Sequence, residues 1–244
     1  MSQGGLEEPR LMKIESMFNT STAEINSRCW NPYLGISINN KVFDLDYIYD
    51  FMFWASGCAK ERAAVLIVDI IQHINNEVFD RVGSLKALDK AFRKADEVLH
   101  LCERALDMLS PERRERVSIL RWTDVIQEEH FIHNLDILNE AYVRDKRFRE
   151  LLASITIRNL GEIVKRLDNS QVEKLSRYIL NELPEIIMGF LHDGIHYNLS
   201  AYPDRIVAIY EELKGHDFFR EICSRLRGIG NSAHVEVYSP DKAR

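Results

Sequence analysis

The chain has 244 residues, of which 45% are hydrophobic, and its formal net charge is -6 at pH 7. This length and apolar content can bury one sizeable core, and no linker is visible, so we expect a single domain over residues 1–244. The negative charge argues against general binding to DNA, and any nucleic-acid contact must come from a local basic patch.

The apolar runs and the cysteine content indicate the cellular compartment of the protein. The longest apolar runs are far shorter than the ~20 residues that a membrane helix requires, and no signal peptide is visible. Four cysteines, Cys29, Cys58, Cys102 and Cys223, lack the close paired spacing of a metal site. Sparse cysteines of this kind are typical of reduced thiols, so we expect a cytoplasmic protein without a membrane segment.

The first half of the chain has the pattern of strands and helices in alternation. Residues 10–18 alternate and predict an edge strand. A short apolar run ends at Ser37, and residues 41–55 have helical spacing. Residues 63–71 form a run that is apolar except for Asp69 and rich in β-branched side chains, as in a strand that is buried on both faces. The order strand, helix, strand implies a parallel crossover.

Later segments complete the prediction of an α/β fold. Residues 117–122 and 234–238 are predicted strands, whereas residues 124–167 and 171–191 have helical periodicity. We therefore expect a doubly wound, mostly parallel sheet flanked by helices.

A long helix is predicted over residues 84–109, with one apolar and one basic face. Acidic residues dilute the basic face, and ordinary solvation explains most charged faces of this kind. A nucleic-acid backbone is the alternative partner. The basic face contains Lys86, Lys90, Arg93, Lys94, His100 and Arg104.

Ser37 is the candidate nucleophile. It ends an apolar run and is followed by small polar residues, and ligands of parallel sheets bind outside the carboxyl ends of the strands. A serine in this position is more often a turn or helix-capping residue. The Gly-x-Ser-x-Gly turn of serine hydrolases is absent, which disfavours a serine esterase.

Three further residues, Tyr178, Glu182 and Tyr202, favour the interpretation of Ser37 as a nucleophile over that of a capping residue. Tyr178 and Glu182 are four residues apart in an apolar periodic segment, so both side chains lie on one helix face. Pro184 follows, and Tyr202 lies about twenty residues beyond. This Gly-x-Ser-x-x-Asn run, the later Tyr-x-x-x-Glu-x-Pro run and the final Tyr together resemble the tRNA-dependent cyclodipeptide synthases over nearly the whole chain.

The resemblance implies a reaction and a fold. Members join two aminoacyl-tRNAs into a cyclodipeptide, without ATP or another cofactor, on a Rossmann-like domain similar to the catalytic domain of class I tyrosyl- and tryptophanyl-tRNA synthetases. Ser37 would carry the aminoacyl group as an ester, and Glu182 with Tyr178 would hold its α-ammonium. Tyr202 would relay a proton, and Asn40 would support the loop or polarise a carbonyl.

The same resemblance implies the partners and a pocket. We expect aminoacyl-tRNAs as substrates, held along the basic helix face at Lys86, Lys90, Arg93, Lys94 and Arg104, and a monomeric enzyme. Polar residues in the pocket of the first aminoacyl group predict a small or partly polar side chain. That pocket would include Tyr33, Gly35, Leu66, Val68, Glu185 and Ser200.

Family sub-groups differ near the catalytic residues. One has Asn three residues after the Ser and His after the last Tyr, and the other has Pro in that final place. This chain combines Asn40 with Pro203, and we favour the Pro type because Pro203 cannot supply what the His does.

Two other classes of protein remain as alternatives. Residues 174–177, Lys-Leu-Ser-Arg, look like the second signature of an ATP-using class I synthetase, but they lie in a predicted helix, and Lys174 is taken as solvated. A non-catalytic tRNA- or nucleotide-binding module lacks support because no Gly-rich phosphate loop is present. No metal site is expected, because no ligand stands at a compact spacing beside the histidines at 130, 133, 192 and 196.

Overall fold

The computed structural model describes residues 12–203, 206–227 and 232–238. In these residues a six-stranded sheet has the order β1-β8-β7-β2-β3-β4, and a separate two-stranded hairpin pairs β5 with β6. β1 is antiparallel to β8, whereas the other four pairings of the large sheet are parallel. The strands are β1 Lys13–Phe18, β2 Pro32–Ser37, β3 Ala63–Val68, β4 Val117–Arg121, β5 Phe190–His192, β6 Ile195–Tyr197, β7 Leu199–Tyr202 and β8 Ala233–Tyr238.

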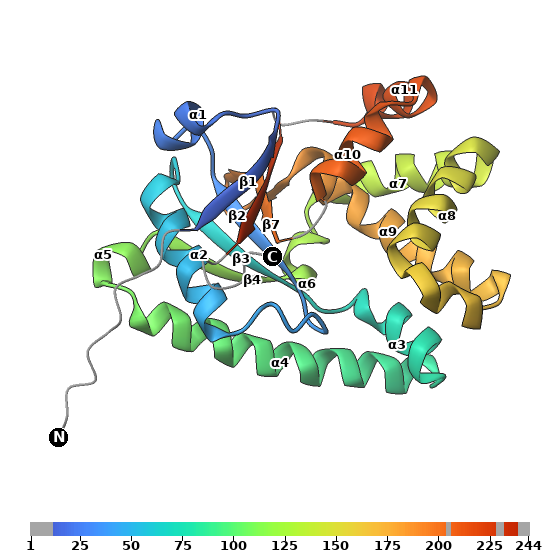
Figure 1. Ribbon diagram of the computed structural model, residues 1–244, viewed down its shortest axis with the longest axis horizontal. Helices are drawn as coiled ribbons and strands as arrows, with labels where there is room; N and C mark the ends of the chain where they lie inside the picture. The colour runs from blue at the N-terminus through green and yellow to red at the C-terminus, as the bar shows by residue number, and fades with distance from the viewer. Residues whose placement is uncertain (1–11, 204–205, 228–231, 239–244) are drawn as a thin grey trace.

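Helices flank the sheet, as Figure 1 shows, with α4 running below it and α7, α8 and α9 gathered to one side. The predicted α/β class with a mostly parallel sheet is therefore confirmed, while the organisation of residues 1–244 as one domain stays a prediction. The helices are α1 Thr22–Asn26, α2 Leu45–Cys58, α3 Gln72–Asp80, α4 Ser84–Met108, α5 Pro111–Arg114, α6 Trp122–Val125, α7 Glu129–Arg144, α8 Lys146–Leu160, η1 Gly161–Arg166, α9 Asn169–Met188, α10 Ile206–Lys214 and α11 Asp217–Arg225.

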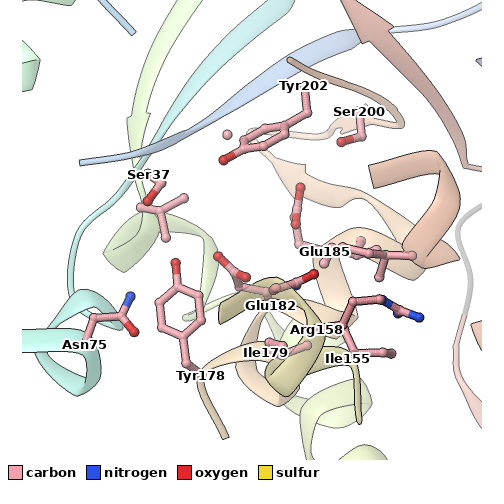
Figure 2. Close-up of a pocket in the computed structure, with 15 residues that line it drawn as sticks. Ser37, Asn75, Ile155, Arg158, Tyr178, Ile179, Glu182, Glu185, Ser200 and Tyr202 are labelled. Atoms are coloured by element: carbon pink, nitrogen blue, oxygen red, sulfur yellow. The ribbon is translucent and has the colours of Figure 1, made fainter. Parts of the chain in front are cut away.

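Strict alternation along the central strands assigns each side chain to one face of the sheet. Leu34 and Ile36 of β2 pack with α2 and α4 in one apolar core. Tyr33 of the same strand packs on the opposite face, with Ala64 and Leu66 of β3. Successive side chains of a strand point to opposite faces, so Gly35 and Ser37 lie on the Tyr33 face. Figure 2 and the lining of the cavity described below agree with this placement.

Several predicted boundaries are wrong for identifiable reasons. The apolar run at residues 63–71 ends as a strand at Val68, because its last residues turn into α3, a helix that the sequence did not predict. The helix predicted from residue 41 begins at Leu45, since the Asp44 carboxylate caps it by accepting the Tyr47 N–H at 3.0 Å. Ser37 is therefore not the cap of that helix.

The later elements also depart from the prediction. Residue 122 begins α6 rather than ending a strand, and the helical pattern over 124–167 divides into several helices. Helix α9 continues past Pro184 to Met188. The helix predicted over residues 171–191 therefore ends earlier than predicted, because strand β5 begins at Phe190. Strands β1 and β8 confirm the predictions at 10–18 and 234–238, except that residues 10 and 11 lie outside the described part.

Gly189 joins α9 to the β5–β6 hairpin and predicts a local sensitivity to substitution. Its backbone angles of φ 67° and ψ -160° lie in a region that only glycine adopts readily. A Cβ atom there would stand 2.1 Å from the backbone oxygen of Tyr197.

We expect Gly189→Ala to lower the free energy of unfolding by about 3 kcal/mol, because strain and the clash with backbone add together. Urea unfolding followed by circular dichroism measures it. Gly194→Ala is the control, because Gly194 shares a positive φ of 77° but has open space around it. Equal losses in both variants would show that the contact with Tyr197 is unimportant.

Candidate active site

A cavity of about 540 Å³ opens at the carboxyl ends of β2, β3 and β7. The last residues of these strands, Ser37, Val68 and Tyr202, all line it, and α8 and α9 supply the facing wall. Parallel strands place their carboxyl ends at one edge, which is where ligands of open α/β sheets bind. The lining residues are Gly35, Ser37, Val68, Asn75, Ile155, Arg158, Asn159, Tyr178, Ile179, Glu182, Glu185, Ile186, Ser200, Tyr202 and Ile209.

The structure brings Ser37, Tyr178, Glu182 and Tyr202 together around this cavity. Figure 2 shows the Tyr178 hydroxyl directed toward Ser37, with the Glu182 carboxylate beside it and Tyr202 on the opposite side. These side chains come from β2, α9 and β7, which are separated widely in the sequence. Their convergence supplies a hydroxyl, a carboxylate and two phenols to one bound molecule.

Ser37 and Tyr178 share a hydrogen-bond partner that the sequence did not reveal. Gln72 Nε2 lies 3.1 Å from Ser37 Oγ and 2.7 Å from the Tyr178 hydroxyl oxygen. Burial raises the pKa of Tyr178 well above its ordinary value, and the neighbouring Glu182 adds to the shift. Tyr178 therefore stays protonated and can donate to the Glu182 carboxylate.

Two carboxyl groups in the cavity have raised pKa values. Burial raises the pKa of Glu182 to about 8, with a further contribution from Glu185 and an opposing one from the Tyr178 hydrogen bond. Burial likewise raises the pKa of Glu185 to about 7, against the hydrogen bond from Tyr33. Both groups would be stabilised as carboxylates by a ligand that brings a positive charge or hydrogen-bond donors.

Other predicted pocket residues divide between the cavity and the core beneath it. Gly35, Val68, Glu185 and Ser200 line the cavity, but Tyr33 and Leu66 are not among its lining residues in the described part of the chain. Both are at most 1% exposed because they lie deeper on the same sheet face.

Tyr33 and Leu66 can therefore affect the cavity only through their neighbours. The Tyr33 ring packs edge-on against Phe190, and its hydroxyl lies 3.3 Å from the backbone oxygen of Glu185. Leu66 is paired with Gly35 in the β2–β3 register.

Asn40 and Tyr202 occupy different positions around the nucleophile. The Asn40 N–H donates to the backbone oxygen of Ser37 at 2.9 Å, and its side-chain oxygen accepts from the Val42 N–H at 3.1 Å. These bonds hold the turn that follows Ser37, in keeping with a supporting role. Tyr202 ends β7, and its ring packs edge-on against Phe43 at a centroid distance of 5.6 Å.

The basic face of α4 is exposed, as the periodicity predicts, while Ala91, Ala95 and Cys102 are buried on the opposite face. Several cations of this face are already paired with acidic residues. These ion pairs join Lys90 to Asp80 at 2.6 Å, Arg93 to Asp89 at 3.1 Å and Lys94 to Glu97 at 2.8 Å. Pairs between exposed side chains are weak, so a polyanion can compete for the same cations.

The segment that resembles a synthetase signature has no mobile loop. Lys174 and Arg177 lie inside α9, and Arg177 pairs with Glu173 one turn away. Lys174 is exposed, as expected, with its side chain 53% accessible, and it also forms an ion pair with Glu77 of α3 at 3.0 Å. This pair connects the two helices that carry Gln72 and Tyr178.

Several cavity residues were missed by the sequence analysis. Asn75 belongs to α3, which was not predicted, and Ile155, Arg158 and Asn159 belong to α8, whose helical periodicity gave no sign of a ligand site. The run Gln72–Asn76, polar except for Ile74 and separated from the end of β3 by only three residues, is the signal that could have found the α3 side of the cavity.

Fold and site together define an α/β protein with a ligand cavity at the carboxyl ends of parallel strands. The cyclodipeptide synthase family matches the chain over residues 16–223, and the chain belongs to that family. It is thus a tRNA-dependent aminoacyltransferase that makes cyclodipeptides. A comparison with curated protein sequences finds no match.

Solved structures of cyclodipeptide synthases have the same fold at low sequence identity. One from Bacillus thermoamylovorans is 18% identical, with a TM-score of 0.70 and coverage of 89% of this chain and 92% of the other. One from Mycobacterium tuberculosis, described as related to type I tRNA synthetases, is 17% identical, with a TM-score of 0.70 and coverage of 96% and 98%. One from Fluoribacter dumoffii is 14% identical, with a TM-score of 0.65 and coverage of 94% and 99%.

The raised pKa values of Glu182 and Glu185 predict how stability depends on pH. Because the folded protein holds these protons more tightly than the unfolded chain, the free energy of unfolding falls as pH rises from about 4.5 toward about 8. Glu185→Gln removes one titrating group and should reduce this fall by on the order of 2 kcal/mol.

Urea unfolding at several pH values between about 5 and about 8 measures the effect. Glu150→Gln is the control, since Glu150 lies on the surface of α8 with its side chain 62% exposed. An unchanged pH dependence in Glu185→Gln would contradict the account of this buried carboxyl group.

Proposed function

We propose that this enzyme works by a ping-pong mechanism in which Ser37 carries first an aminoacyl group and then a dipeptidyl group. The observation that carries the proposal is the convergence of the Ser37 hydroxyl, Tyr178 and Glu182 on one cavity. Aminoacyl-tRNA is already an activated ester, so the cavity has only to bind and orient its reacting groups. A covalent intermediate divides the transfer into easier steps.

In the first transfer, Ser37 Oγ forms a bond to the carbonyl carbon of the aminoacyl ester. The bond between this carbon and the ribose oxygen of the tRNA breaks, and the Ser37 proton leaves with that oxygen. Glu182 holds the α-ammonium, and Tyr178 orients it. Binding of the ammonium ionises Glu182, because a neighbouring positive charge lowers a carboxyl pKa. A charge-assisted hydrogen bond then holds the intermediate.

In the second transfer, the α-ammonium of the aminoacyl-enzyme gives one proton to the Glu182 carboxylate, and the resulting free amine attacks the ester carbon of another aminoacyl-tRNA. An amide bond forms, the second tRNA leaves with a proton, and a dipeptidyl ester remains on Ser37. Its terminal amine then attacks the ester carbon at Ser37 and closes the 2,5-diketopiperazine ring. Ser37 Oγ leaves and regains a proton, which the Tyr202 hydroxyl relays. Asn40 supports the loop after Ser37 throughout.

The side chain of the first amino acid lies beside Glu185 and Ser200 in this proposal. Both residues line the cavity, Glu185 from α9 and Ser200 from β7, and Gly35 and Val68 line it as smaller apolar residues. Tyr33 holds the Glu185 segment from below, and Leu66 is a packing residue. Buried polar groups favour a ligand that satisfies their hydrogen bonds, so we propose a polar side chain here rather than a large aromatic one.

The tRNA backbone lies along the exposed cations of α4. Lys86, Lys90, Arg93, Lys94 and Arg104 stand on one helix face, and phosphate groups are the partner that such a face attracts. No described helix is long and apolar enough to cross a membrane. We further propose that the enzyme is a cytoplasmic monomer without affinity for DNA, and that Pro203 places it in the sub-group with Pro after the last Tyr.

Ser37→Ala is the direct test of the covalent step. The wild type, exposed briefly to a mixture of charged tRNAs, should gain the mass of one aminoacyl residue and release a cyclic dipeptide. The variant should do neither, with product formation reduced at least about a thousandfold, because it lacks the attacking oxygen. Intact-protein mass spectrometry and analysis of the small molecules measure both. Cyclic dipeptide made at the wild-type rate by Ser37→Ala would refute the mechanism.

Removal of two cations from α4 tests the proposed tRNA contact. In the double variant Arg93→Ala/Lys94→Ala, we expect the Kd for charged tRNA to rise about tenfold at low salt, and the slope of log Kd against log salt to fall by about one to two. Fluorescence titration at several salt concentrations measures both quantities. Lys13→Ala/Lys60→Ala removes two equally exposed cations elsewhere, each 62% exposed. Equal weakening in both double variants would exclude a specific contact with α4.

A further inference from the structure

Gln72 connects the nucleophile to the wall of the cavity formed by α9. It is the first residue of α3 and is fully buried. One amide nitrogen lies within hydrogen-bond distance of both Ser37 Oγ, at 3.1 Å, and the Tyr178 hydroxyl, at 2.7 Å. An amide NH₂ group has two hydrogens, so it can donate to both oxygens at once.

The other end of the Gln72 side chain determines which way the amide faces. Its oxygen accepts from Asn75 Nδ2 at 3.0 Å and from Asn39 Nδ2 at 3.4 Å. Both partners are donors, which suits the amide oxygen and not the NH₂ group. The NH₂ group therefore faces Ser37 and Tyr178, so both of these hydroxyl oxygens accept.

This orientation gives the hydrogen bonds around the nucleophile a single direction. Because the Tyr178 oxygen accepts from Gln72, its own hydrogen is free to donate to Glu182, with which it shares a hydrogen bond. Ser37 Oγ likewise accepts from Gln72, so its own hydrogen points to the Tyr178 oxygen, with which Ser37 shares a hydrogen bond. Rotation of the Gln72 amide by half a turn would place its oxygen against Ser37 and reverse these directions.

We propose that Gln72 is a further catalytic residue, whose amide donates a hydrogen bond to Ser37 Oγ when that oxygen attacks and again when it leaves. The proposal rests on the covalent role of Ser37 proposed above. Negative charge grows on this oxygen as its proton departs and as the ester bond breaks. A preorganised donor in a site withdrawn from water stabilises such charge far better than water does. Gln72 transfers no proton in either step.

Gln72→Met tests the donor, because methionine has a similar length and no N–H group. We expect the single-turnover rate of Ser37 acylation to fall about 100-fold, the size of effect seen when one such donor is removed, while the Kd for charged tRNA changes less than about twofold. Rapid acid quench and intact-protein mass spectrometry measure the rate. Thermal unfolding of each variant shows whether the fold is retained.

Gln72→Glu gives a second readout that a purely structural role would not move. The introduced carboxylate only accepts hydrogen bonds, but its protonated form can donate one. The acylation rate of this variant, relative to the wild type at the same pH, should therefore rise as pH falls from about 8 to about 6, since burial raises the pKa of the new carboxyl group. Gln72→Met should show no such recovery.

Asn76→Ala is the matched control on the same helix. Asn76 is buried, and its amide donates to the backbone oxygen of Ala87 in α4 at 3.0 Å, away from Ser37. It should lower stability and leave the acylation rate within about threefold of the wild type.

Three outcomes overturn the inference. If Gln72→Met acylates at the wild-type rate, or Asn76→Ala loses as much activity as Gln72→Met, the amide has no role as a donor, although the proposed function stands. If the wild type itself gains no acyl group, the proposed function fails and the role of Gln72 fails with it.

Discussion

The parallel pairing of β2 with its two neighbours is the constraint on which the active site depends. β2 lies between β3 and β7, with Ser37 paired to Val68 on one side and Tyr33 paired to Ser200 on the other. A slip of one residue would turn Ser37 away from the cavity, because neighbouring side chains of a strand face opposite sides. The apolar core beneath Leu34 and Ile36 resists that slip, since the slip would bury polar side chains in their place.

A second constraint comes from the polarity of the cavity. Glu182 and Glu185 are both withdrawn from water, which raises the pKa of each, and Glu185 adds to the shift at Glu182. A nearby ammonium group lowers the pKa of these carboxyl groups and so favours their ionised forms. The same groups that lower the free energy of unfolding at high pH can therefore bind a positively charged substrate. The buried Gln72 amide supplies donors to Ser37 and Tyr178 without adding charge.

The sequence predicted the sheet and the convergence of Ser37, Tyr178, Glu182 and Tyr202 better than it predicted the other residues that line the cavity. Strands β2 and β3 were readable because they are buried on both faces, whereas the central strand β7 was not predicted as a strand. The resemblance supplied the site residues of α9 and β7. Helix α3 was missed because Ile70 and Ile71 extend the apolar run of β3 into a turn. Gln72, the first residue of that helix, was missed for the same reason. The resemblance placed Tyr33 and Leu66 in the pocket, but the depth of a residue below the cavity depends on how α9 and the β5–β6 hairpin pack, which no local pattern encodes.

The measurement that tests this account most directly is the location of the acyl group. Protein quenched with acid after brief exposure to charged tRNA would be digested, and the peptide that contains Ser37 fragmented in a mass spectrometer. The account predicts one aminoacyl residue on the Ser37 oxygen, as an ester that mild alkali removes. An acyl group on any other residue, or cyclic dipeptide formed with no acylated peptide at any time point, would contradict it.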